Sequence, residues 1–268
     1  MSVRISGVIS CALFLSCWAA GLSTAYAQSA YLWDGIYGGV NAGAAHSSTC
    51  NQWASTGTRS DAAANTALTN NNCLGSGFVG GLQIGDSFQS GRFALGLGAD
   101  IDIWHATNSS STVLYSGAAL PRGSYAFYNR LNPTRFVILG PRVGYAGNQW
   151  MPYLRVGAMV PFGGRDNSVS YTPTAAASPT ASFDTGKGYS SVGWVAGAGA
   201  EWGLKGAWSM SAEYLHVNLG KATGSTAACG GTAANCATLS GIAFTDARDA
   251  SRTDIFRIGI SYWFNYWD

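Results

Sequence analysis

The hydrophobic pattern of the chain has a period of two, and it is clearest near the C-terminus. From Phe256 to Phe264 every second residue is large and apolar, whereas Arg257, Gly259 and Ser261 occupy positions between them. Alternation of this kind predicts a β-strand with two chemically different faces. Because aromatic residues gather at the end of the segment, its apolar face is typical of a strand that contacts lipid and ends at the membrane interface. A half-buried strand of a soluble sheet is the alternative.

Segments with this alternation recur along the chain, and we count eight predicted strands. Turns of three or four residues join strands two to three, four to five and six to seven, whereas long polar segments separate the other pairs. This arrangement is typical of outer-membrane barrels. We therefore predict an all-β fold, an eight-stranded antiparallel up-and-down transmembrane β-barrel with long extracellular loops and short periplasmic turns. The predicted strands span 31–46, 77–88, 92–104, 134–146, 150–162, 188–202, 207–219 and 252–264.

Composition supports a barrel over a helical membrane protein. Charged residues make up only 10% of the chain, against about a quarter in ordinary globular proteins. Beyond the N-terminal segment, no apolar run reaches the roughly 18 residues that a membrane helix needs. Alternating strands reconcile these two facts, because lipid-facing and lumen-facing residues interleave. The formal net charge of +2 and the scattered basic residues give no indication of nucleic-acid binding.

The N-terminus has the features of a secretory signal peptide. Arg4 supplies a positive charge, residues 8–22 are mostly apolar, and residues 25–27 match an A-x-A cleavage site. We predict that residues 1–27 are removed and that residues 28–268 form the barrel domain. The predicted location of the mature protein is the bacterial outer membrane.

The same alternation assigns most charged residues of the strands to the inner face of the barrel, with Asp86 on the outward phase as a departure. In segment 92–104 the face opposite the large apolar residues holds Asp100, Asp102 and several glycines. Charges buried in a lumen are costly unless they pair, so we expect an interlocking ion network there. Its predicted members are Asp100, Asp102, Arg142, Arg155, Glu201, Glu213 and Arg257.

Four cysteines remain after removal of the signal peptide, in an exported and oxidising environment where disulfides persist. Cys50 and Cys73 flank one polar segment, and Cys229 and Cys236 flank another. We predict the local disulfides Cys50–Cys73 and Cys229–Cys236, although four cysteines formally allow three connectivities. No histidine lies at ligand spacing beside either pair, so we predict no metal site and no cofactor.

Four glycine-rich stretches carry a family resemblance. They lie at 33–43, at 77–85, at 140–146 together with 150–153, and at 193–202 together with 213–215. Together they resemble the small outer-membrane β-barrel proteins of alphaproteobacteria, which are related to opacity-type and OmpA-type transmembrane barrels. The resemblance implies a surface-antigen-like protein that contacts outer-membrane lipids.

The last predicted strand carries a second resemblance. Gly259, Tyr262 and Phe264 are similar to the polar-x-Gly-x-x-aromatic-x-aromatic signal that the barrel-assembly machinery reads. In the usual pattern the final aromatic residue ends the chain, whereas here four residues follow Phe264. The resemblance implies that the barrel-assembly machinery is a partner during membrane insertion.

The histidines are the remaining candidates for chemistry. His46 and Ser48 share a face at the end of the first predicted strand, a spacing that resembles part of a lipid A deacylase site. No acidic residue lies nearby in the sequence to orient the histidine, as a Ser–His pair requires. We therefore predict no catalytic residues and no enzymatic activity.

The function that the sequence favours is a structural or surface-exposed role. An eight-stranded barrel is just wide enough for side chains to fill its interior, so the ion network is expected to close the lumen. The long loops would then be available to external partners. A narrow porin-like pore for small solutes is the first alternative, because the lumen glycines could leave room for water. A lipid A-modifying enzyme is the third.

Overall fold

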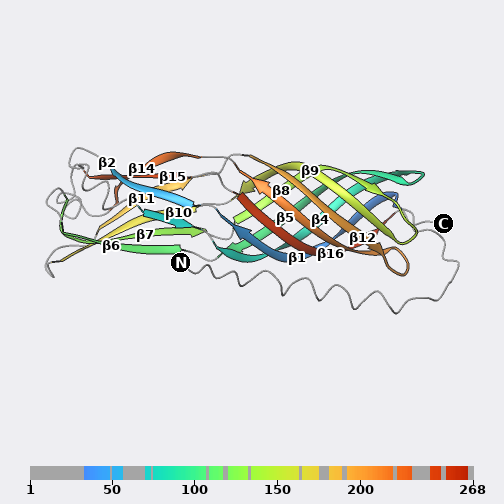
Figure 1. The fold of residues 1–268 in the computed structure, drawn as a ribbon, viewed down its shortest axis with the longest axis horizontal. Helices are drawn as coiled ribbons and strands as arrows, with labels where there is room; N and C mark the ends of the chain where they lie inside the picture. The colour runs from blue at the N-terminus through green and yellow to red at the C-terminus, as the bar shows by residue number, and fades with distance from the viewer. Residues whose placement is uncertain are drawn as a thin grey trace, which may run out of the picture. The chain divides into compact units, whose positions relative to one another are not determined.

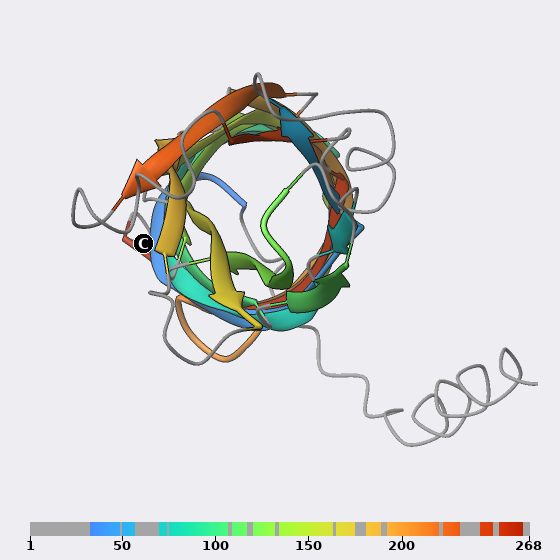
Figure 2. The same cartoon turned by 90° about the vertical axis from the view of Figure 1, so that its left-hand side faces the viewer.

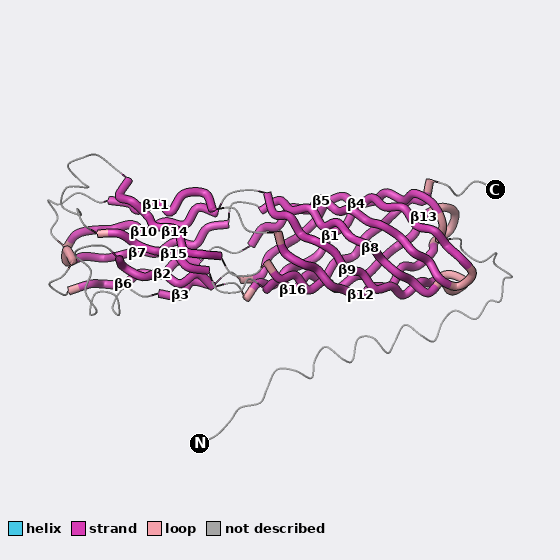
Figure 3. The backbone as a smooth tube through the Cα atoms, turned by 90° about the horizontal axis from the view of Figure 1, so that it is seen from above, coloured by secondary structure: helices cyan, strands magenta, loops and turns pink. Residues whose placement is uncertain are grey.

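The computed structural model describes residues 33–48, 50–56, 70–73, 75–106, 109–116, 120–131, 134–162, 165–174, 181–188, 192–219, 222–230, 242–248 and 252–264. The chain divides into two units, Met1–Ala30 and Tyr31–Asp268, and all described residues belong to the second. The predicted signal peptide lies outside them and stays a prediction. Every regular element of the described part is a β-strand (Figure 3). Among these residues we find no helix of the length and apolarity needed to cross a bilayer.

Eight strands form a closed barrel in which each strand is antiparallel to both neighbours (Figures 1 and 2). The order around the barrel is β1-β16-β13-β12-β9-β8-β5-β4. The predicted eight-stranded up-and-down barrel is therefore confirmed. Its strands are β1 (Gly35–Ser47), β4 (Ser76–Ser90), β5 (Phe93–Ala106), β8 (Thr134–Tyr145), β9 (Trp150–Phe162), β12 (Gly193–Gly203), β13 (Trp208–Asn218) and β16 (Arg252–Trp263).

The predicted strand boundaries agree with the barrel strands to within a few residues except at one place. The segment 188–202 was predicted as one strand, but β12 begins at Gly193 and Gly188 is the last residue of β11 (Ala181–Gly188). Glycine and serine dominate this boundary and carry no alternation that would separate two strands. Two of the short turns contain a glycine in the left-handed region, Gly91 with φ 60° and Gly206 with φ 73°. A residue with a Cβ atom is strained in that conformation.

The long connections contain strands of their own, where the sequence indicated polar loops. Each connection contributes two strands to a second, eight-stranded antiparallel sheet of order β3-β2-β15-β14-β11-β10-β7-β6. Cα atoms of β3 lie within 8 Å of Cα atoms of β6, so the two edges approach each other and the sheet curls. The remaining strands are β2 (Cys50–Thr56), β3 (Asn70–Cys73), β6 (Ser109–Tyr115), β7 (Gly123–Leu131), β10 (Arg165–Pro173), β14 (Ala222–Gly230) and β15 (Ala243–Arg248).

One face of the second sheet carries a buried aromatic core. Phe244 lies at its centre, with its ring centroid 4.9 Å from that of Phe183 and 5.8 Å from that of Tyr125. The buried tyrosine hydroxyls have partners, since Tyr171 donates to the carbonyl oxygen of Arg122 at 3.1 Å. Burial raises the pKa of the Tyr171 hydroxyl. The core consists of Trp53, Tyr115, Leu120, Tyr125, Phe127, Val169, Tyr171, Ala181, Phe183, Ile242 and Phe244.

The barrel has the opposite arrangement of polarity. Along β5 the large apolar side chains from Phe93 to Ile103 point outward and are exposed, whereas Asp100 and Asp102 between them are buried in the lumen. The same holds along β16, where Phe256, Ile258 and Ile260 are exposed and Arg257 is buried. An apolar exterior of this kind is what contact with lipid requires.

Candidate functional site

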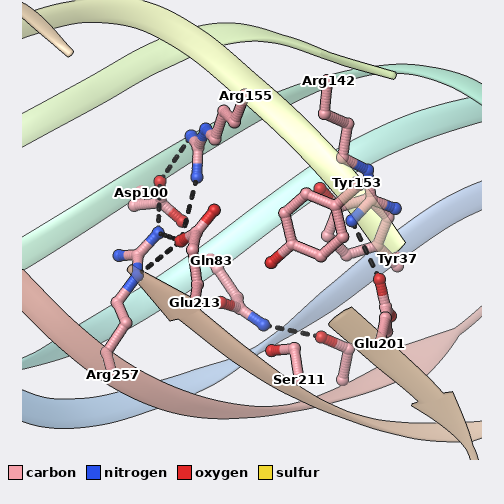
Figure 4. A pocket seen from close by; sticks show the side chains of 11 residues that line it. Tyr37, Gln83, Asp100, Arg142, Tyr153, Arg155, Glu201, Ser211, Glu213 and Arg257 are labelled. Carbon is pink, nitrogen blue, oxygen red and sulfur yellow. Dashed lines mark hydrogen bonds and ion pairs between the residues drawn. The ribbon is translucent and has the colours of Figure 1, made fainter. Parts of the chain in front are cut away.

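The centre of the lumen is an ion network built around Arg257 of β16. Its guanidinium contacts Glu213 of β13 (Nη2–Oε2 2.6 Å), Asp102 of β5 (Nη1–Oδ2 2.9 Å) and Asp100 of β5 (Nη2–Oδ2 3.2 Å). Figure 4 shows Arg257, Glu213 and Asp100 converging from different strands. Arg257 and Glu213 are register partners, so the pairing of β13 with β16 sets this contact directly.

A second guanidinium completes the central cluster. Arg155 of β9 lies 2.5 Å from Asp100 (Nη2–Oδ2) and 3.8 Å from Glu213 (Nη1–Oε2). Asp100 and Glu213 therefore each bridge Arg155 and Arg257. All of these side chains are almost fully buried. In a low-dielectric interior the attraction within an ion pair is strong, but it roughly offsets the free-energy cost of removing both charges from water. Loss of one partner therefore leaves the other charge buried without compensation.

The third arginine lies in a different environment. Arg142 of β8 donates to Glu201 of β12 at 2.9 Å, and Ser209 Oγ donates to the same carboxylate at 2.6 Å. The guanidinium carbon also lies 4.3 Å from the ring centroid of Tyr37 and 5.6 Å from that of Tyr153. Cation–π contacts of this kind stabilise a guanidinium whose Nε and Nη2 groups have no hydrogen-bond partner within the part of the chain that the structure describes.

The charges of the network do not balance. The central cluster holds three carboxylates, from Asp100, Asp102 and Glu213, against the two guanidiniums of Arg155 and Arg257. Asp102 is the least engaged of the three among the described residues, because it forms an ion pair with Arg257 alone, whereas Asp100 and Glu213 each pair with both guanidiniums. The surplus negative charge of the cluster is therefore associated with Asp102.

Two apolar clusters lie in the lumen in addition to the ion network. Trp33, Tyr37, Met151 and Trp263 are buried near the short turns, with the ring centroids of Tyr37 and Trp263 4.9 Å apart. Toward the long connections the inward positions are also apolar. The sequence reasoning missed this second cluster, because inward residues such as Leu215 are as apolar as the outward ones and the alternation disappears. Its members are Ala45, Val79, Trp104, Phe136, Ile138, Met159, Val195, Leu215, Val217, Leu219 and Ile255.

Very little empty space remains beside the network. The cavity lined by Arg142, Arg155, Arg257 and their neighbours offers about 20 Å³ to the centre of a water molecule. About 10–15 Å³ is needed for one water, so the cavity holds roughly one. Two of the lumen glycines near the network are closely packed by neighbouring strands. A Cβ atom at Gly81 would lie 2.4 Å from Asp102 Oδ1, and one at Gly43 would lie 2.6 Å from the Cα of Arg257.

The cysteines are described only in part. Cys50 and Cys73 are register partners in the pairing of β2 with β3, which puts the two residues opposite each other on adjacent strands. Cys229 belongs to β14, whereas Cys236 lies outside the described residues. Both disulfides stay predictions.

The residues of the C-terminal assembly signal lie on both faces of β16. Gly259 faces the lumen beside Ser211 and Gln83. Tyr262 points outward, with its ring centroid 5.3 Å from that of Phe264. Recognition of these residues by the assembly machinery stays a prediction.

The candidate residues His46 and Ser48 contact different partners. His46 Nδ1 lies 2.9 Å from Ser76 Oγ of β4, and Ser48 Oγ donates instead to the carbonyl oxygen of Arg252 at 3.4 Å. An acidic residue is nevertheless close, because Asp254 of β16 is the register partner of His46. That neighbour is distant in the sequence and only strand pairing reveals it. Among the described residues, no group of three His, Cys, Asp or Glu side chains could hold a metal ion.

Comparisons with known proteins agree with this geometry. The family model described as outer membrane protein beta-barrel domain matches residues 15–264. The 31 kDa outer-membrane immunogenic proteins of Brucella melitensis and Brucella suis are each 27% identical over 198 residues, covering 74% of this chain and 76% of the relative.

Solved structures of outer-membrane proteins are also similar to the chain. The outer membrane protease OmpT from Escherichia coli matches with a TM-score of 0.45 and 12% identity, over 86% of this chain and 97% of its own. OprG from Pseudomonas aeruginosa matches with a TM-score of 0.40 and 11% identity, over 88% of this chain and 98% of its own.

Proposed function

Because the chain belongs to the family of outer-membrane protein β-barrel domains, we propose that it is a closed, non-conducting barrel that holds its second sheet at the cell surface. The observation that carries this proposal is the filled lumen. Ion pairs occupy its centre, apolar clusters occupy the regions on either side, and the cavity beside the network has room for about one water.

Closure follows from the energetics of the network. A solute that entered the lumen would have to separate Arg257 from Glu213 or Arg155 from Asp100. Breaking one buried ion pair of this kind costs about 3–5 kcal/mol, because the remaining charge stays buried without its partner. A solute would also have to displace packed apolar side chains such as Phe136 and Ile138, and these offer no hydrogen bonds in exchange.

The second sheet is the part that we propose to act at the surface. Its aromatic core fixes the eight strands without help from lipid, so the outer side chains are held on a rigid support. Those side chains are largely small and polar, as along β6, where Ser110 and Thr112 are exposed. A polar, ordered surface is suited to binding an external partner, in agreement with a relationship to immunogenic outer-membrane proteins. We propose no enzymatic role for the chain.

Planar-bilayer conductance on the refolded protein tests closure, after heat-dependent gel mobility has established that the barrel is folded. We expect no discrete open-channel steps from the unaltered chain. Arg257→Ala is expected to admit water and to produce brief openings, whereas Ile258→Ala, its lipid-facing neighbour, is expected to stay silent. Stable steps from the folded, unaltered barrel would overturn the proposal and favour the narrow pore.

A further inference from the structure

The residues that precede the first barrel strand pack into the turn-side end of the lumen. β1 begins at Gly35, so Trp33 and Asp34 take no part in the pairing of the barrel strands. Trp33 is nevertheless fully buried, and its ring contacts that of Trp263 edge-on, with the ring centroids 5.9 Å apart. We call residues 33–34 the N-terminal strap. Its indole ring fills a part of the lumen that no barrel strand fills.

One side chain of the neighbouring hairpin holds the strap. Gln89 of β4 accepts a hydrogen bond from the backbone N–H of Trp33 through Oε1 at 2.7 Å, and the backbone N–H of Gln89 donates to Asp34 Oδ1 at 2.9 Å. The side-chain amide of Gln89 also donates to the carbonyl oxygen of Gly91 at 3.0 Å, which fixes its orientation. Each hydrogen bond between strap and hairpin involves a side chain. The strap can therefore separate from the hairpin without breaking the pairing of the barrel strands.

Gly35 forms the junction between the strap and β1. Its φ is 102°, a backbone conformation that residues with a Cβ atom rarely adopt. The chain passes at this residue from the strap into the regular strand. A glycine at such a junction provides a hinge, because it has the widest choice of backbone conformations of any residue.

The strap covers the part of the ion network that lies nearest to the turns. Trp263, on which the ring of Trp33 packs, donates from Nε1 to Ser209 Oγ at 3.0 Å, and Ser209 Oγ donates to Glu201 at 2.6 Å. Glu201 is in turn the ion-pair partner of Arg142. One chain of contacts thus runs from the strap to the third guanidinium. Water that entered beneath the strap would meet this chain first.

We propose that the N-terminal strap is a lid that opens and closes the turn-side end of the lumen, with Gly35 as its hinge and Gln89 as its latch. Because side-chain contacts hold the strap and strand pairing does not, it opens locally while the barrel stays folded. Opening admits water as far as Glu201 and Arg142, whereas the central cluster still blocks solutes. The inference rests on the closed lumen proposed above and adds a second, separable closure to it.

Thiol labelling of the barrel refolded in lipid vesicles tests the lid. Ala94 is 2% exposed and belongs to the same apolar cluster as Trp33, so Ala94→Cys provides a reporter thiol beneath the strap. The rate of maleimide attachment at position 94, measured by mass spectrometry of peptides, follows the fraction of molecules in which the strap is open. Adding Trp33→Ala removes the apolar anchor of the strap and should raise this rate at least about tenfold. Adding Gln89→Leu instead removes the latch but keeps the indole, and should raise the rate roughly fivefold.

Two further variants of the reporter protein are controls. Trp150→Ala removes an outward-facing indole that is 47% exposed at the same end of the barrel, and should leave the rate unchanged. Met151→Ala leaves a cavity in the same apolar cluster with the strap in place, and should raise the rate clearly less than Trp33→Ala does. All variants are compared after heat-dependent gel mobility shows a folded barrel.

The outcomes separate the lid from the closed centre. An unchanged rate in Gln89→Leu, or a rise in Met151→Ala as large as that in Trp33→Ala, would overturn the lid. Conductance measures the centre independently. Stable channel steps from an unaltered barrel would refute the closed centre, and the lid would then still be judged by the labelling rates. A silent barrel whose labelling ignores the strap variants would refute the lid alone.

Discussion

The lumen of the barrel and the core of the second sheet are built from the same period-two alternation with opposite polarity. Around the ion network of the barrel the large aliphatic residues point outward and the charged residues are buried, as Ile258 and Arg257 show on adjacent positions of β16. In the second sheet the aromatic core is buried and most exposed positions are small or polar, as Phe127 and Ser110 show. The same strand pattern is therefore compatible with two environments. The apolar face of the barrel contacts lipid, whereas the apolar face of a sheet in water must be buried within the sheet itself.

The two interiors also differ in how strongly one residue depends on another. In the aromatic core each side chain contributes its own buried area, so removal of one leaves a cavity but no unpaired charge. In the lumen each charge depends on its partners, and removal of one leaves the others buried without compensation. This difference predicts that the lumen tolerates substitution less evenly than the aromatic core.

The largest effect is expected from Arg257→Ala. The substitution leaves Asp100, Asp102 and Glu213 with the single guanidinium of Arg155, so two negative charges are uncompensated. We expect a loss of about 4 kcal/mol in the free energy of unfolding. Urea titration of the protein refolded into lipid vesicles measures it. Ile258→Ala is the control, and a comparable loss there would show that the ion network has no special role.

A smaller and local effect is expected from Phe244→Ala in the second sheet. Its ring contacts those of Phe127, Phe183 and Tyr125, so its removal leaves a cavity that costs about 3 kcal/mol. Amide hydrogen exchange should increase along β14 and β15, while the gel mobility of the barrel stays unchanged. Leu114→Ala, at a residue that is 72% exposed, is expected to alter neither. If the barrel loses its heat-dependent mobility as well, the two regions do not fold independently.

The sequence predicted the barrel well because lipid enforces a strict alternation over long segments. Along β5, Leu95, Leu97 and Ile101 take the outward positions that their phase predicts. The seven charged residues assigned to the lumen are also buried there, and their contacts follow from strand register. The individual ion pairs could not be assigned from the sequence, because Asp100 and Arg155 come together only when β5, β8 and β9 are paired.

The second sheet was missed for a physical reason. Its strands are short, and their aromatic residues alternate with Ser, Thr and Ala, which are equally common in polar loops. In β10 the buried face within the described pattern rests on Val169 and Tyr171 alone. Two apolar positions do not identify a strand, and the core exists only because eight such strands from four connections are brought together. Long-range pairing of this kind leaves no local signal.

The smallest effect is expected from Asp102→Asn, which removes a negative charge from the lumen and leaves both guanidiniums of the central cluster in place. The substitution leaves two carboxylates facing two guanidiniums in the central cluster, and the amide oxygen can still accept from Arg257 Nη1, which lies 2.9 Å from the carboxylate in the unaltered chain. Removal of the surplus charge offsets the weaker hydrogen bond, so the free energy of unfolding should change by less than about 1 kcal/mol. Asp100→Asn, which disturbs contacts to both Arg155 and Arg257, should cost clearly more in the same vesicle titration. If Asp102→Asn proved as damaging as Arg257→Ala, the negative charge of Asp102 would be needed for stability, and the cluster would have to be balanced by a proton or cation held elsewhere in the lumen.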